Sequence, residues 1–207
     1  MDLKQVRSES IQVAKKIGVE IPPTLPLMDS GLKVRDKNEV AARMLAMHAV
    51  AVSAYGFDRN KVIAWLNQEA LSDSLSEHEK QFVFEHIGQP NRFKMQIEAI
   101  WALAWAMGIA NDLDFTKDCD DRFVMQLPNL KQSQSSADFR NRINPRPLAQ
   151  IASACDLAYC LHWAIRQSEG EGKQLAGKLK PYVVIERRRA LEWLLSEEEW
   201  ENVPLDT

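Results

Sequence analysis

The stretch DLAYCLHWA, residues 156–164, brings an acid, a phenol, a thiol, an imidazole and an indole into nine positions. These groups would suit nucleophilic catalysis if the thiol and the imidazole lay within hydrogen-bond reach. A helix turns about 100° per residue, which places His162 about 120° from Asp156 and about 160° from Cys160. Neither residue can form a dyad with His162 on this helix. We therefore predict a core histidine that is bonded to a neighbour.

The same rotation divides the helix into two faces. Asp156, Cys160 and Trp163 lie on one side, with Tyr159 at its edge. The other side is an apolar arc: Ile151, Ala154, Cys155, Leu157, Ala158, Leu161, Ala164 and Ile165. A helix with two such faces is predicted to contact neighbours on both sides.

Two charged residues lie within apolar patterns. Glu98 is the only charge in IEAIWALAWAMG, residues 97–108, and Arg187 occupies the middle of the apolar arc of YVVIERRRALEWLL, residues 182–195, while Arg188 and Arg189 are expected to point outward. A buried charge needs a compensating partner. We predict that Glu98 and Arg187 pair. The alternative partners are Asp156 for Arg187 and His162 for Glu98.

The remaining motifs do not indicate a cofactor or a metal. GKQLAGKL, residues 172–179, has P-loop spacing, but Leu179 replaces the hydroxyl residue and no strand precedes it. His78, Glu85 and His86 lack a fourth ligand nearby, so we interpret them as part of a surface helix. Neither GxSxG nor HExxH occurs.

Composition limits the class of protein. The chain has 207 residues, a net charge of −3, 45% apolar residues and 27% charged residues, as is usual for a globular protein. The sequence contains no basic stripe interleaved with aromatic residues, so nucleic-acid binding is disfavoured. The apolar run from Ala99 to Ala110 is too short for a membrane span, and the polar N-terminus lacks a signal segment. Three cysteines without CxxC spacing favour a reducing compartment, the cytoplasm.

Caps and breakers predict an all-α fold: a single globular domain, residues 1–207, with about seven to nine helices. Residues 19–35, which contain PPTLP, read as an extended linker within it. Residues 196–207 form an acidic tail that contains Trp200 and is predicted to pack on the body. The expected helices cover residues 2–17, 36–56, 58–70, from 76 onward, 90–108, 119–126, 147–168 and 181–195.

Several stretches together resemble a bacterial family catalogued as domain of unknown function 4272. They are EAIWALAWAMG, DLAYCLHWA, VIERRRALEWL and the closing WENVPLDT. The resemblance spans nearly the whole chain and is strongest after residue 90. It implies a helical intracellular domain and implies no reaction.

Two functions compete at this point. The first is a cytoplasmic protein-interaction or regulatory module without catalytic activity, which binds another protein or forms a homodimer, because no reaction motif stands out. The second is a hydrolase-type enzyme that uses Glu98 or Asp156 with His162 and Arg187 as catalytic residues. A cleft that joins these groups would favour the enzyme, and a closed core would favour the module.

Overall fold

The computed structural model describes residues 1–175 and 177–207. Across this described part the regular structure is helical, with nine α-helices and no strand, so the all-α prediction is confirmed. The P-loop-like stretch 172–179 includes position 176, which lies outside the described residues. Contacts divide the chain into two compact units, and a single domain stays a prediction.

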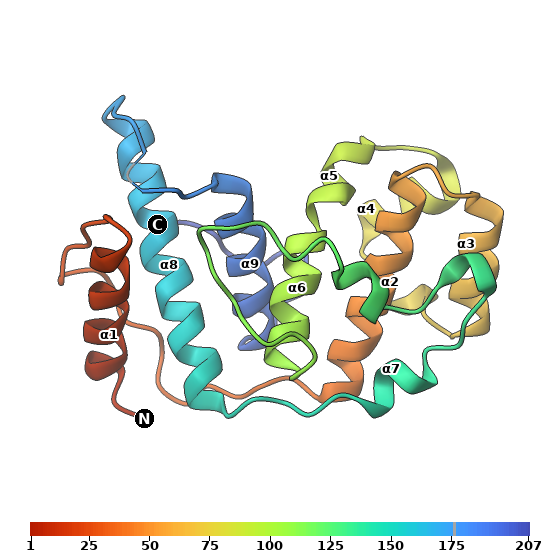
Figure 1. Cartoon of the computed structure of the whole chain (residues 1–207), viewed down its shortest axis with the longest axis horizontal. Coiled ribbons are helices and arrows are strands. Elements are labelled where there is room, and N and C mark those ends of the chain that lie inside the picture. The colour runs from red at the N-terminus through yellow and green to blue at the C-terminus, as the bar shows by residue number, and fades with distance from the viewer. Residues whose placement is uncertain (176) are drawn as a thin grey trace. The chain divides into compact units, whose positions relative to one another are not determined.

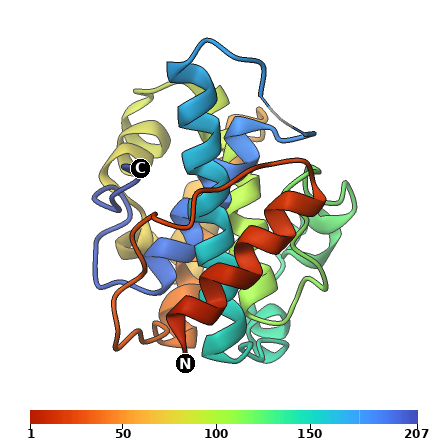
Figure 2. The same cartoon turned by 90° about the vertical axis from the view of Figure 1, so that its left-hand side faces the viewer.

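Unit 1 comprises residues Met1–Val34, Leu113–Asp118 and Arg146–Thr207. Its helices are α1 (Leu3–Lys16), α8 (Leu148–Gly170) and α9 (Pro181–Leu194). The long helix α8 packs against α1 on one side and against α9 on the other (Figures 1 and 2). The prediction that this helix has neighbours on both sides is therefore confirmed.

Two irregular segments near the ends of the chain lie outside the helices of unit 1. The first, which we call the extended segment, is residues 19–34, and the second, the C-terminal tail, is residues 196–207. Trp200 and Val203 of the tail are buried, and the Trp200 ring meets the Trp193 ring edge-on, with 5.7 Å between centroids. Apolar side chains thus hold the tail against unit 1.

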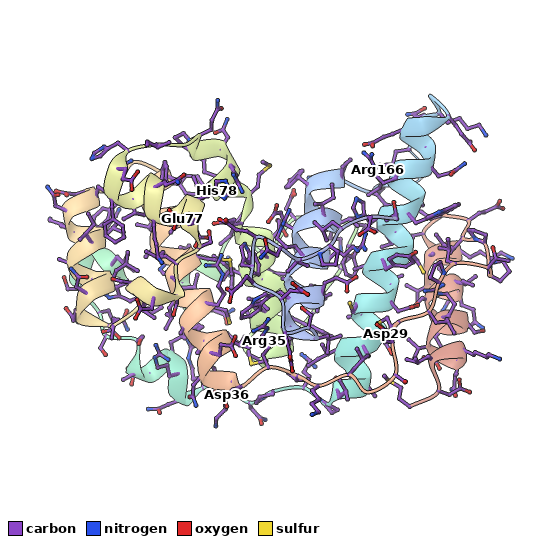
Figure 3. The ribbon with its side chains drawn as sticks, turned by 180° about the vertical axis from the view of Figure 1, so that it is seen from behind. Asp29, Arg35, Asp36, Glu77, His78 and Arg166 are labelled. Atoms are coloured by element: carbon purple, nitrogen blue, oxygen red, sulfur yellow. The ribbon has the colours of Figure 1, made fainter. Side chains whose placement is uncertain are left out.

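Unit 2 comprises residues Arg35–Asp112 and Cys119–Pro145. Its α-helices are α2 (Lys37–Ala54), α3 (Arg59–Gln68), α4 (Glu77–Lys80), α5 (Pro90–Met95), α6 (Ile97–Ala106) and α7 (Ala137–Asn141). Most of α2 is buried, because α3, α5 and α6 all pack against it. Asp36, which Figure 3 labels, caps α2 by accepting from the backbone N–H of Asn38 at 2.9 Å.

The helix expected over residues 90–108 is wrong, because two helices, α5 and α6, meet at Gln96. The Gln96 side chain is buried and donates to Glu79 at 2.9 Å. This hydrogen bond fixes the junction, and the local sequence pattern does not predict it. The helix expected near residues 119–126 is reduced to a short 3₁₀ turn, Phe123–Gln126. The expected start at Ser76 is confirmed, with Ser76 and Glu79 forming a capping box.

Candidate functional site

The two charges predicted to pair lie in different units. Glu98 of α6 is buried in unit 2 and accepts from the backbone N–H of Cys119 at 2.9 Å. Arg187 of α9 is buried in unit 1 and donates to the carbonyl oxygens of Asp114 at 2.7 Å and Lys117 at 3.0 Å. Arg187 therefore anchors the segment 113–118 to α9. The pairing of Glu98 with Arg187 stays a prediction.

Asp156 of α8 has a partner that the sequence analysis did not name. Arg7 of α1 donates through Nη2 to Oδ1 of Asp156 at 2.8 Å and through Nε to both carboxylate oxygens, at 3.2 and 3.1 Å. Arg7 is 3% exposed and Asp156 1% exposed, so this is a buried ion pair. The suggested pairing of Asp156 with Arg187 is wrong, because Arg7 reaches the carboxylate from the facing helix.

The thiol of Cys160 lies beside this ion pair and donates to Oδ2 of Asp156 at 3.9 Å. Burial, together with the Asp156 charge, raises the pKa of the Cys160 thiol to about 12. Burial also raises the pKa of Cys155 well above its ordinary value. Because only a thiolate is a good nucleophile, these two cysteines stay in their unreactive form.

His162 of α8 is a buried histidine bonded to a neighbour, as predicted. Its Nδ1 accepts from Nη1 of Arg188 at 2.7 Å, which places the proton of the neutral ring on Nε2, because a guanidinium can only donate. Burial, with the positive charge of Arg188, lowers the pKa of His162 to about 4. The suggested pairing of His162 with Glu98 stays a prediction, because the two residues lie in different units.

The expected outward direction of Arg188 is also wrong, since this residue is 3% exposed. Its Nη1 and Nη2 donate to the carbonyl oxygens of Leu205 and Asp206, at 3.2 and 3.0 Å, and its Nε donates to Glu192 at 3.3 Å. The C-terminal tail thus covers the face of α9 that local periodicity assigns to solvent. Arg188 attaches this tail to the helices through backbone acceptors.

Arg7 does the same for the extended segment. Its Nη1 and Nη2 donate to the carbonyl oxygens of Leu25 and Pro26, at 2.9 and 2.8 Å. The guanidinium carbons of Arg7 and Arg188 lie 5.5 and 4.9 Å from the centre of the Tyr159 ring. Tyr159 is therefore held by two cation–π contacts, at the point where both irregular segments are attached.

A pocket of about 370 Å³ lies between the two irregular segments of unit 1. Its volume falls in the range of roughly 300–1,000 Å³ that is common for ligand sites. Figure 3 shows Asp29, one of its lining residues, on the extended segment. The lining residues are Arg7, Pro26, Leu27, Met28, Asp29, Leu32, Cys155, Tyr159, Arg188, Glu192, Leu195, Ser196, Glu198, Pro204 and Asp206.

The structure does not bring the four predicted catalytic candidates to this pocket. The lining residues in the described part of the chain do not include Glu98, Asp156, His162 or Arg187. Sequence reasoning missed Arg7, Tyr159 and Arg188, of which Arg7 had a usable signal. It lies on the helical stripe of α1 that also carries Ser10 and Ala14, a stripe that is buried.

Protonation of His162 should make the folded state less stable in acid. The pKa of His162 is about 4 in the folded protein and 6.5 ordinarily. Below pH 6.5 this histidine is therefore protonated in the unfolded chain and stays neutral in the folded protein. Stability is then lost as the pH falls from 6.5 towards 4, by about 2 kcal/mol at pH 5. Urea unfolding at pH 7.5 and pH 5 measures this loss.

The matched variant is His162→Gln, which keeps an acceptor for Arg188 and removes the titration. The pH-dependent loss should be about 2 kcal/mol smaller in this variant than in the unmodified chain. Parallel losses in the two proteins would contradict the assignment.

No group of three or more His, Cys, Asp or Glu side chains within residues 1–175 and 177–207 is arranged to hold a metal ion. Over the same residues, every helix is too short or too polar to cross a bilayer. Within these residues Cys119, Cys155 and Cys160 are not joined by disulfide bonds.

Comparison with known proteins gives one family. No curated protein matches the chain, and no solved structure matches it either. A family described as "Domain of unknown function (DUF4272)" matches residues 6–203. This match includes α8, α9 and most of α1, the extended segment, the C-terminal tail as far as residue 203 and the whole of unit 2. The protein therefore belongs to the DUF4272 family.

Proposed function

We propose that this protein is a cytoplasmic protein-interaction module that binds a partner protein in the pocket of unit 1. The observation that carries the proposal is the construction of the pocket. Residues 26–32 of the extended segment and residues 195–206, which lie mostly in the C-terminal tail, form much of its lining. Arginines attach both segments to the helices. Binding sites are often formed by loops that a rigid scaffold positions.

The apolar part of the lining supports a protein partner. Leu27, Met28 and Leu32 come from the extended segment, and Leu195 and Pro204 come from the other end of the chain. Leu27 is 40% exposed, which is costly for a leucine that stays in water. A partner side chain that entered the pocket would remove this surface from water.

The groups beneath the pocket support binding over catalysis. The carboxylate of Asp156 is held by Arg7, and the Nδ1 of His162 is held by Arg188. The cysteine thiols of α8 have raised pKa values, and His162 has a lowered one. General acid–base catalysis favours pKa values near the working pH, and these shifts move away from it.

Affinity capture with the tagged full chain, followed by chemical cross-linking and mass spectrometry, tests the proposal. The expected result is a partner recovered in amounts comparable to the bait, with cross-links to residues 26–32 and 195–206. Ser196→Trp should abolish the capture, because Ser196 lines the pocket and an indole would fill it. Thr24→Trp is the control, since Thr24 is an exposed residue of the extended segment outside the pocket lining.

Equal capture by the two tryptophan variants would contradict the proposed binding surface. Recovery of a second copy of this chain alone, with the same cross-links, would replace the external partner by a homodimer.

A further inference from the structure

We propose that the pocket of unit 1 accepts a basic side chain, arginine or lysine, from a segment of the partner protein. This inference rests on the protein-interaction function proposed above and names the chemistry of its ligand. Three observations support it: the acidic residues of the lining, the hydrogen bonds that its two arginines already make within the protein, and its apolar surface.

Carboxylates from both irregular segments line the pocket. Asp29 comes from the extended segment and Asp206 from the C-terminal tail, and both are exposed. Glu198 is a further acidic residue of the lining. Each of the two segments thus carries an exposed carboxylate, and a cation in the pocket would have a hydrogen-bond acceptor on both sides.

The two arginines of the lining do not make it a site for an anion. In Arg7, Nε, Nη1 and Nη2 all donate to protein oxygens, and Asp156 balances the charge. In Arg188 the same three nitrogens donate to Glu192, His162 and the tail carbonyl oxygens. An anionic ligand would have to compete with these bonds, whereas a cation leaves them intact.

The rest of the lining suits the stem of a basic side chain. Leu27, Met28 and Leu32 offer apolar contacts to methylene groups, which arginine and lysine bury while their charged ends stay near water. Tyr159 also lines the pocket, and a phenol oxygen can accept a hydrogen bond from a cation. An aliphatic chain that ends in a cation satisfies all three kinds of contact.

Fragments that mimic side chains test this inference on the full chain. Amide shifts in ¹H–¹⁵N spectra are followed during titration with n-butylguanidinium, n-butylammonium, N-butylurea and pentanoate. The two cations should shift residues 26–32 and 195–206 saturably. n-Butylguanidinium should bind about tenfold more tightly than pentanoate, as expected for about two exposed ion pairs.

The double substitution Asp29→Asn and Asp206→Asn should weaken the binding of n-butylguanidinium by about three- to tenfold and leave the binding of N-butylurea unchanged. Glu20→Gln is the matched control, because Glu20 is an exposed acid of the extended segment outside the pocket lining. This control should bind every fragment as the unmodified chain does.

Two results would overturn the inference: pentanoate binding as tightly as n-butylguanidinium, or unchanged cation binding in the double Asn variant. If a partner is captured and Ser196→Trp abolishes the capture, but the cations do not bind, the proposed function stands. In that case only the basic ligand is refuted. Cation binding without any captured partner would refute the proposed function and leave the pocket a cation site.

Discussion

Arg7→Met lowers the free energy of unfolding by about 3–5 kcal/mol, because it leaves the carboxylate of Asp156 buried without its partner. The substitution also removes the donors for the carbonyl oxygens of Leu25 and Pro26, so the extended segment should lose protection from amide exchange. Urea unfolding measures the first effect, and hydrogen–deuterium exchange measures the second.

A double-mutant cycle with Asp156→Leu separates the pair from its surroundings. The double variant should cost much less than the sum of the single ones, since neither buried charge is then isolated. Arg166→Met, on the helix that carries Asp156, is the control. Arg166, which Figure 3 labels, is 62% exposed in its side chain and pairs with Glu169 at the surface, so its loss should cost less than about 1 kcal/mol. Additive single losses would contradict the pairing of Arg7 with Asp156.

Glu79→Leu should likewise cost about 3–5 kcal/mol, because it leaves the buried guanidinium of Arg43 without its carboxylate. Arg43 of α2 donates to Glu79 at 2.6 and 2.8 Å, and the Glu79 side chain is completely buried. The same carboxylate accepts from the backbone N–H of Ser76 and from the side chain of Gln96, each at 2.9 Å. It thereby joins α2, the start of α4 and the junction of α5 with α6.

Glu77→Gln is the matched control for Glu79→Leu. Glu77, labelled in Figure 3, lies two residues earlier on α4, is exposed and bonds only weakly to Gln81, at 3.4 Å. Chemical unfolding should show a change below about 0.5 kcal/mol for Glu77→Gln. Similar losses for the two substitutions would show that the Arg43–Glu79 pair contributes nothing.

Local signals predicted the helices well where a cap or a breaker stands at the boundary. Asp58 caps α3, Ser76 caps α4, and Pro181 begins α9. The prediction failed at Gln96, where no proline or glycine marks the end of a helix. The break there serves a hydrogen bond to Glu79, a contact that depends on tertiary structure and leaves no trace in local spacing.

The pocket was beyond local reasoning for a similar reason. Arg7 and Asp156 are 149 positions apart, and Arg188 lies 18 positions before the carbonyl group that it binds in Asp206. Helical rotation shows which residues share a face, but it cannot show that the C-terminal tail covers the face of Arg188. His162 was placed correctly because it lies within the apolar arc of its own helix, which local spacing can show.

Both irregular segments are attached through backbone carbonyl oxygens, so their attachment does not depend on which side chains stand at these positions. Leu25, Pro26, Leu205 and Asp206 offer Arg7 and Arg188 an atom that every amino acid possesses. Exchanging the side chains at these positions leaves the acceptors in place. The sequence of both segments can therefore vary at these positions while their attachment to the helices persists.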